Sequence, residues 1–260
     1  MRLTLYHIHA SPFAEKARWA LDFKGLEYKS ELLIPGRHAD TVEKISGTRT
    51  VPVLVDTDAP APIADSTDIL QHLERIAPDH ALFPEGDDER QQVLEIEDWL
   101  DEQVVQPCAR MNYSFLSEQP EAFFTYFSRG LSRTQKLGMA FIRPMLPRIV
   151  KQFREQRELS REAAKGYHRE VDSAFERIER MLANSGGRYL VGDSFTAADL
   201  TAACMLGLAL RLAGTPWEVT DAERRAYPGR VEPDELLDFR AELAGRSTTE
   251  WVAGLWRNHR

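Results

Sequence analysis

HASPFAEKARWAL, residues 9–21, joins a strand-like run to a helical one. The run before it, residues 3–8, is short and mostly apolar. Within residues 9–21 the apolar side chains recur at the spacing of one helix face, at Phe13, Ala17, Ala20 and Leu21. Glu15, Lys16 and Arg18 fall on the other side of that helix. The chain therefore opens with a strand and an amphipathic helix, and Ser11 and Pro12 lie at their junction.

The following patterns extend this order to a small mixed domain. Gly25 ends the first helix. Further elements are predicted as strands at residues 28–34, 53–55 and 63–64 and a helix from Ser66. The order βαβ, a variable segment and then ββα indicates an α+β domain over residues 1–80. A polar joint with proline and glycine follows, so we expect a linker at residues 81–88.

Residues 89–260 carry long helical periodicities in place of strand patterns. We expect an all-α helical bundle there. Pro107 lies inside the first long helix, and it should kink or divide that helix because proline lacks the N–H donor of a helix interior.

Composition and charge narrow the class of protein. The chain has 260 residues, of which 43% are hydrophobic, and a net charge of -8. Its two cysteines, Cys108 and Cys204, are far apart, which argues against a disulfide framework and favours a cytoplasmic protein. Met1 leads straight into strand-like sequence, so we expect no leader, and no apolar run approaches the roughly 20 residues of a membrane span. The acidic balance argues against a nucleic-acid partner.

Ser11 and Pro12 have two interpretations. Serine is a favoured helix N-cap and proline is favoured at the first helical position, so the pair is a common start signal for a helix. A hydroxyl at a helix N-terminus also lies beside N–H groups whose partial positive charge favours an anion. The residues alone leave both interpretations open, and the two roles are compatible.

Four stretches make the chain resemble the glutathione transferase family, which joins a thioredoxin-like N-terminal domain to an all-helical domain. They are SPFAEKAR (11–18), TVPVL (50–54), ADST (64–67) and GDSFTAADL (192–200). The first is similar to the opening of helix 1 in the tau and omega classes, where a serine or cysteine handles the thiol of glutathione. Ala14 stands where a glutaredoxin has its second cysteine, so dithiol chemistry is not expected. The resemblance covers nearly the whole chain.

This resemblance implies residues for each part of glutathione. Ser11 would donate a hydrogen bond to the thiolate, and a cis Pro52 would turn the backbone of Val51 toward the cysteinyl part. Asp65 and Ser66 would hold the γ-glutamyl end. Candidates for the glycyl carboxylate are Arg37, His38 and Arg49. The implied glutathione site comprises Ser11, Phe13, His38, Arg49, Val51, Pro52, Asp65 and Ser66.

Two of these assignments have purely structural alternatives. Ser66 can be a helix N-cap, as Ser11 can. Pro52 can simply begin an edge strand.

GDSFTAADL is the strongest family signature and carries no chemistry. Thr196 as N-cap with Asp199 three residues later is a capping pair, and Phe195 before it can pack on Leu200. We expect these residues to fix a buried helix over residues 197–212.

The pocket for a second substrate is expected against the first long helix of the helical domain. Its candidate residues are His9, Met111, Asn112 and Tyr113. That helix face suits the core equally well, and His7 and His9 suit a packed strand.

Residues 122–154 contain no acid, although the chain as a whole is acidic. Their cations interleave with aromatic residues and are Arg129, Arg133, Lys136, Arg143, Arg148, Lys151 and Arg154. Three interpretations remain open: a solvated face that pairs with acids elsewhere, a lid that attracts anionic co-substrates, or a patch for a membrane or an acidic partner.

The sequence thus predicts a serine-type glutathione transferase that adds the thiolate of glutathione to a small, largely apolar electrophile. Glutathione is the expected co-substrate, no metal is expected, and the resemblance implies a homodimer. The alternatives are other glutathione-dependent chemistry, such as isomerisation, dehalogenation or ether cleavage, and a non-catalytic transferase fold that serves as an interaction module.

Overall fold

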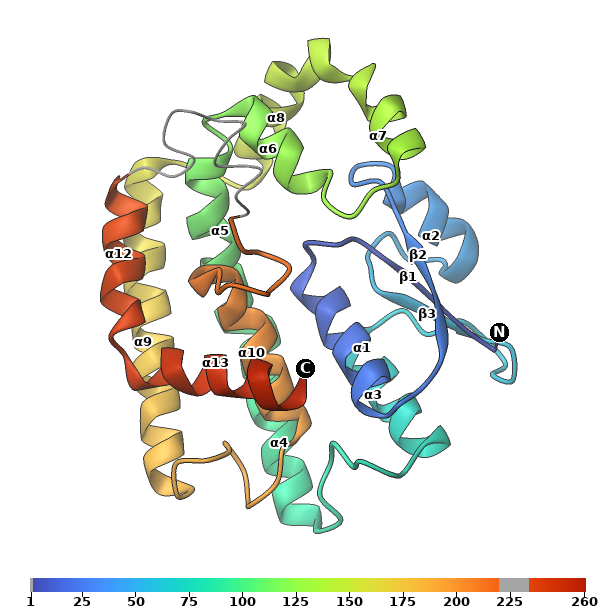
Figure 1. Cartoon of the computed structure of the whole chain (residues 1–260), viewed down its shortest axis with the longest axis vertical. Helices are drawn as coiled ribbons and strands as arrows, with labels where there is room; N and C mark the ends of the chain where they lie inside the picture. Colours follow the sequence, from blue (N-terminus) through green and yellow to red (C-terminus); the bar gives the residue numbers. More distant parts are fainter. Residues whose placement is uncertain (1, 220–233) are drawn as a thin grey trace.

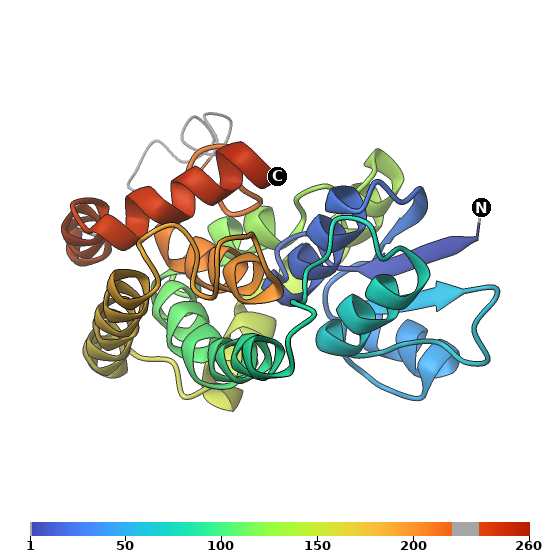
Figure 2. The same cartoon turned by 90° about the horizontal axis from the view of Figure 1, so that it is seen from below.

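A computed structural model describes residues 2–219 and 234–260 of the chain. A small sheet domain lies beside a larger helical domain (Figures 1 and 2). The first domain contains β1 (Leu3–His7), α1 (Pro12–Phe23), β2 (Tyr28–Leu32), α2 (His38–Ser46), β3 (Val53–Asp56) and α3 (Ser66–Ile76). The expected fold class, an α+β thioredoxin-like domain followed by an all-α domain, is confirmed.

The sheet has three strands in the order β2-β1-β3. β1 runs parallel to β2 and antiparallel to β3. The fourth strand expected at residues 63–64 is only a single bridge between Ile63 and Leu54. Pro60 and Pro62 lack the N–H donor that a longer ladder would need, which explains why pairing stops at one residue.

The helical domain follows a segment, residues 77–86, without helix or strand. Leu82 and Phe83 in this segment are buried, and the carbonyl of Leu82 accepts a hydrogen bond from the N–H of Ala197 at 2.8 Å. The described elements are α4 (Asp87–Trp99), η1 (Leu100–Val104), α5 (Val105–Leu116), α6 (Pro120–Phe127), α7 (Arg133–Ala140), η2 (Arg143–Met145), α8 (Leu146–Gln156), α9 (Arg161–Asn184), α10 (Ala197–Leu210), α12 (Asp234–Ala244) and α13 (Ser247–His259).

Pro107 divides the first long helix, as expected. It lies in the first turn of α5 and cannot donate to the carbonyl four residues earlier. The residues just before it, η1, form a π-helix between α4 and α5. The hydrogen-bond pattern of the long helix thus changes where this donor is missing.

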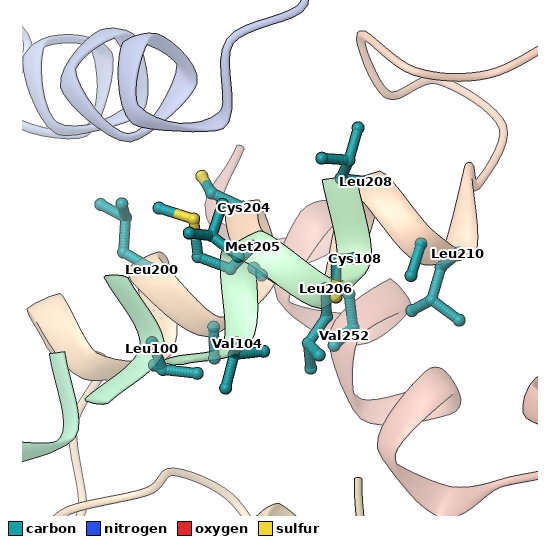
Figure 3. Close-up of a cluster of buried hydrophobic side chains, with 14 of the residues drawn as sticks. Leu100, Val104, Cys108, Leu200, Cys204, Met205, Leu206, Leu208, Leu210 and Val252 are labelled. Atoms are coloured by element: carbon teal, nitrogen blue, oxygen red, sulfur yellow. The ribbon is translucent and has the colours of Figure 1, made fainter. Parts of the chain in front are cut away.

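α10 is the centre of the helical core. All of its residues are buried, and Leu200, Cys204 and Leu208 pack among the side chains drawn in Figure 3. Asp199, in its first turn, is fully buried. Its Oδ2 accepts from the N–H and the hydroxyl of Thr196, both at 2.9 Å, and its Oδ1 accepts from the N–H of Leu190 at 2.8 Å. The capping pair expected from GDSFTAADL is therefore confirmed, and burial raises the pKa of Asp199 to about 6.

Replacing Asp199 tests this capping pair. Asp199→Ala should lower the free energy of unfolding by about 3 kcal/mol or more, because it leaves three buried donors without an acceptor. Asp193→Ala, at an exposed acid in the same loop, should change it by less than about 0.5 kcal/mol. Urea denaturation of both variants measures the difference, and equal losses would contradict the role of Asp199.

Candidate functional site

Ser11 caps α1 and faces a cavity at the same time. Its side chain accepts a hydrogen bond from the N–H of Ala14 at 3.3 Å, and Pro12 occupies the first helical position. Ser11 also lines a cavity of about 450 Å³. The cap uses the hydroxyl oxygen as an acceptor, so the hydroxyl proton stays available to a group in the cavity.

Val51 lines the same cavity, and the Val51–Pro52 peptide bond is cis. The far side of the cavity is aromatic and aliphatic. The residues that line the whole cavity are Ile8, Ala10, Ser11, Pro12, Pro35, Gly36, His38, Val51, Tyr113, Phe123, Phe124, Phe127, Met139, Ile142, Leu146, Ile149, Phe153, Gln156 and Arg157. A polar end formed at the start of α1 therefore opens onto an apolar wall built by α5 to α8.

Only one of the four residues expected in the electrophile pocket lines this cavity. Tyr113 does so, and its ring packs against Phe127 and Phe153 with centroids 5.7 and 5.6 Å apart. Met111 is fully buried in the core. The side-chain amide of buried Asn112 donates to the carbonyls of Cys108 and Leu208 and its oxygen accepts from Arg240, which is a structural role.

His9 faces a different cavity, of about 650 Å³, together with His7 and Arg18. His7 is packed in its strand: Arg18 donates to its Nδ1 at 2.7 Å, which leaves Nε2 to donate to the hydroxyl of Ser30 at 2.6 Å. Burial, and secondarily the charge of Arg18, lowers the pKa of His7 to about 3 and that of His9 to about 4. Both rings are therefore neutral at physiological pH, and neither lines the cavity that Ser11 faces.

The Asp65–Ser66 pair begins α3. The structural alternative for Ser66, a helix N-cap, is wrong, because Asp65 occupies that position. Asp65 is the N-cap, and its Oδ1 accepts from the N–H groups of Thr67 at 2.8 Å and Asp68 at 3.3 Å. Ser66 is the first residue of the helix and is buried. A carboxylate, a hydroxyl and a helix N-terminus thus share one corner of the N-terminal domain.

The candidates for the glycyl carboxylate lie on α2 and the loop after it. His38 lines the 450 Å³ cavity, and burial lowers its pKa. Arg37 lines a neighbouring cavity of about 410 Å³. Arg49 is exposed and already forms ion pairs with Glu43 and with Asp40, the latter at 3.2 Å. Phe13 is half-buried and packs against the core.

Comparisons with known proteins converge on one family. Residues 5–81 match the glutathione S-transferase N-terminal domain, and residues 158–229 match the glutathione S-transferase C-terminal domain. A curated relative, glutathione S-transferase 1 of Dianthus caryophyllus, is 27% identical over 203 residues, or 76% of this chain and 73% of the relative. The chain belongs to the glutathione S-transferase family.

Solved structures share the fold at low sequence identity. The beta-etherase LigF from Sphingobium sp. strain SYK-6 superposes with a TM-score of 0.61 at 19% identity, over 98% of this chain and 99% of that one. A glutathione S-transferase from Methylobacterium radiotolerans, in complex with glutathione sulfonate, gives 0.54 at 22%, over 97% and 95%. These identities show the fold alone. Family membership makes this chain a glutathione S-transferase-like transferase with glutathione-dependent chemistry.

Behind the Asp65–Ser66 corner, a buried lysine joins the two domains of the transferase. Lys16 of α1 has no exposed surface, and its Nζ donates to Glu97, to Asp101 at 2.6 Å and to Thr67 at 3.3 Å. Thr67 in turn donates to Glu97 at 2.6 Å. Burial raises the pKa of Asp101 to about 6 even with Lys16 beside it. One cation therefore holds α1, α3, α4 and η1 together.

The transferase's cysteines take no part in this site. Cys108 and Cys204 are both free and buried, and burial raises the pKa of each thiol well above its usual range. Among residues 2–219 and 234–260, no group of three His, Cys, Asp or Glu side chains could hold a metal ion. Each helix in that part of the chain is too short or too polar to span a membrane.

The aromatic wall of the cavity was not predicted from the sequence. Phe123, Phe124, Phe127 and Phe153 come from the acid-free segment, where they were visible as aromatic residues between cations. No periodicity assigned them to a pocket, because α6 and α8 are short helices whose orientation depends on the rest of the fold. Arg157 follows α8 and is the one arginine among the described residues that line the cavity. Its guanidinium lies 4.1 Å from the centroid of Phe153.

Removing Lys16 should weaken the contact between the two domains and lower the free energy of unfolding. Lys16→Met leaves Glu97 and Asp101 buried without a cation, so the free energy of unfolding should fall by about 3–5 kcal/mol at pH 7.5. Asp101, whose pKa burial raises to about 6, then lacks the cation that lowers it, so its pKa in the folded protein rises further. The loss that depends on pH is therefore absent below the unfolded value near 4, grows as pH rises from there to the raised folded value, and is complete above it.

Guanidinium denaturation at pH 7.5 and at pH 5 measures this change, and the destabilisation should be smaller at pH 5. Lys29→Met is the matched control, because Lys29 is exposed and pairs with Glu31 on the surface. It should cost less than about 1 kcal/mol at either pH. A Lys16→Met loss that does not depend on pH would contradict the account.

Proposed function

We propose that this transferase conjugates the thiolate of glutathione to a small, largely apolar aromatic electrophile. The observation that carries the proposal is that Ser11, Val51 and the aromatic wall line one cavity. Its volume of about 450 Å³ falls in the usual range for small-molecule sites. A thiolate held at the Ser11 end would face an electrophile held against the wall, which converts a bimolecular reaction into a local one.

In this proposal Ser11 stabilises the thiolate. Its hydroxyl oxygen accepts the N–H of Ala14, so its proton can point to sulfur. At the ordinary thiol pKa of about 8.5, only a few per cent of glutathione is ionised at pH 7. Lowering that pKa by about two units requires roughly 2.7 kcal/mol, which a charge-assisted hydrogen bond and a helix N-terminus can supply together.

The rest of glutathione would extend from Ser11 toward α3. The backbone of Val51 would pair with the cysteinyl part, and the buried Ser66 with the N-terminus of α3 would take the γ-glutamyl carboxylate. The exposed carboxylate of Asp65 would meet the γ-glutamyl amine. His38 is the better-placed candidate for the glycyl carboxylate, because Arg49 is engaged by two acids.

The aromatic wall favours an aromatic electrophile. Phe123, Phe127 and Phe153 present tilted and edge-on rings, with centroids 4.6 to 6.1 Å apart. A planar substrate can stack on such faces and gain more than from area burial alone. The reactive carbon would then lie toward Ser11 and the ring toward α6 and α8.

Ether cleavage is the second candidate reaction. It uses the same thiolate and an aromatic substrate, and the beta-etherase LigF shares the fold. A non-catalytic role is the third alternative. Retention on immobilised glutathione tests the non-catalytic role, and a panel of aryl halides, epoxides and aryl ethers separates the two reactions. The homodimer and the cytoplasmic location expected from the sequence stay predictions.

Ser11→Ala should leave glutathione affinity nearly unchanged and raise the pKa of the bound thiol. Loss of one charge-assisted hydrogen bond, about 1.5–3 kcal/mol, corresponds to one to two pKa units and a turnover about ten- to a hundredfold lower near neutral pH. Activity should partly recover at higher pH. Thiolate absorbance of the complex, titrated from about pH 5 to 10, measures the shift.

Ser160→Ala is the matched control. Ser160 caps α9 in the same way, by accepting the N–H of Ala163 at 3.0 Å, and it does not line the cavity. Its loss should cost about 1 kcal/mol of stability and leave the thiol pKa unchanged. Coincident titration curves for wild type and Ser11→Ala would contradict the catalytic role of Ser11. Ser11→Cys adds an independent check, since it should form a mixed disulfide with glutathione.

Arg157 should favour electrophiles that carry a carboxylate on the ring. Arg157→Gln should raise KM about three- to fivefold for 4-chloro-3,5-dinitrobenzoate, which corresponds to the free energy of one exposed ion pair. KM for neutral 1-chloro-2,4-dinitrobenzene should be unchanged. Added salt should shrink the effect. Lys151→Gln is the control, because Lys151 is an exposed cation of α8 that does not line the cavity. Equal changes for both electrophiles would refute the assignment.

A further inference from the structure

The acid-free segment exposes a row of large apolar side chains. Leu137 is 66% exposed, Phe141 80% and Met145 53%. In the described part of the chain, Leu237 on α12 is the one other large hydrophobic side chain with comparable exposure, at 44%. The three residues of the row are spaced by four: Leu137 lies in α7, Phe141 is its C-cap and Met145 ends η2. We name this row, Leu137, Phe141 and Met145, the apolar strip.

The fold holds the apolar strip outward and does not need it for packing. The inner side of the same segment, Met139, Ile142 and Leu146, packs on Phe124 and lines the cavity. α7 begins at a capping box formed by Ser132 and Gln135, and the side chain of Gln135 also donates to the carbonyl of Leu32 at 2.9 Å. α7 is thus fixed to the N-terminal domain at the margin of the molecule (Figure 1). Its outer row is left in water.

Exposed cations flank the strip along the sequence. Arg133, Lys136, Arg143, Arg148 and Lys151 are all exposed. Two of them meet acids at the surface: Arg143 lies 3.5 Å from Glu121, and Lys151 lies 3.8 Å from Glu155. Arg133, Lys136 and Arg148 form no ion pair with any of the residues that the structure describes. The interpretation of a face that pairs with acids elsewhere therefore does not account for these three cations.

We propose that the apolar strip and its cations dock the transferase on an anionic phospholipid surface. Exposed Leu, Phe and Met interspersed with exposed Lys and Arg are the pattern of an interfacial element that buries its apolar face at the headgroup level. Each cation near such a surface gains from its negative potential.

Charge selects a lipid surface and orients the protein on it. The chain carries -8 overall, whereas residues 122–154 carry only cations. An anionic bilayer therefore attracts this segment more than the rest of the chain, whose net charge is negative. The strip extends over α7, the turn after it and the 3-10 helix η2. A fluid interface accommodates such an irregular row without a groove of matching shape. An acidic protein partner would need such a match, and it is the alternative outcome of the test.

Docking would have a consequence for the substrate. Met139, Ile142 and Leu146 form part of the cavity wall, directly behind the strip. An apolar electrophile dissolved in the bilayer would thus be brought beside the cavity in which we place its reaction.

Sedimentation with vesicles tests the proposal on the full chain. Vesicles of phosphatidylcholine mixed with phosphatidylglycerol should bind the protein about tenfold or more tightly than vesicles of phosphatidylcholine alone. Added salt should remove most of this preference. Equal binding to both vesicles, or no binding to anionic vesicles at low salt, would overturn the proposal.

Two variants separate the strip from the cations. Replacing Leu137, Phe141 and Met145 together by Ser should weaken binding to anionic vesicles about tenfold, whereas Leu237→Ser should not. Replacing Arg133, Lys136 and Arg148 by Gln should abolish the preference for anionic vesicles, and the control that replaces Lys165, Arg169 and Arg180 by Gln should keep it.

None of the substituted residues lines the cavity, so turnover of a water-soluble electrophile should be unchanged in every variant and reports that each is folded. Binding that depends on the cations and not on the strip would mean adsorption of any polyanion and would overturn the proposal. A mass by light scattering that falls only in the Ser variant would assign the strip to contact between copies of the chain, with the same consequence.

Discussion

The position of the reactive end of the site depends on one buried cation. Lys16 is fully enclosed and binds two carboxylates from α4 and η1 and a hydroxyl from α3. A buried ammonium without these partners would cost several kcal/mol, so the two domains can approach only in the arrangement that supplies them. Because Lys16 and Ser11 belong to the start of the same helix, the orientation that satisfies the lysine also aims Ser11 at the cavity.

Other contacts of α1 act in the same direction. The indole N–H of buried Trp217 donates to the carbonyl of Ala10 at 2.9 Å, and that of Trp19 donates to the carbonyl of His259 at 2.7 Å. Arg260 at the C-terminus pairs with Glu15 at 2.8 Å. The residues on either side of Ser11 are therefore held by the helical domain, whereas Ser11 itself is left half-buried and facing the cavity. A donor that is held in place needs fixed neighbours and a hydroxyl proton directed into the cavity, and the oxygen of Ser11 accepts from Ala14 without using that proton.

Much of this fold could be predicted from local sequence, because its decisive signals are short. Helix starts at Ser11 and Ser66, the division at Pro107 and the buried capping pair of Thr196 and Asp199 each depend on a few neighbouring residues. The cis bond before Pro52 came from the family resemblance, since an X-Pro pair alone says little about its isomer.

What could not be predicted depends on packing between distant elements. The helix pattern placed Lys16 and Arg18 on a polar face, yet that face is buried because acids and carbonyls from elsewhere in the fold neutralise it. Met111 and Tyr113 are two residues apart on one helix, and only the packing of α6 and α8 decides which of them meets the cavity. The short helices α6 to α8 carry no period long enough to show which side faces inward.

The acid-free segment shows how one sequence pattern can serve two surfaces. Its inward residues must be apolar to form a dry wall for the cavity, and its outward residues need not be. Leu137, Phe141 and Met145 are apolar outward as well, although leaving such side chains in water is unfavourable and core packing does not require it. Cations alone would keep the segment soluble, and apolar residues alone would favour aggregation. Exposed apolar residues together with cations are favourable only where this face contacts something other than water. The absence of acids over residues 122–154 indicates that the contacting surface is negatively charged.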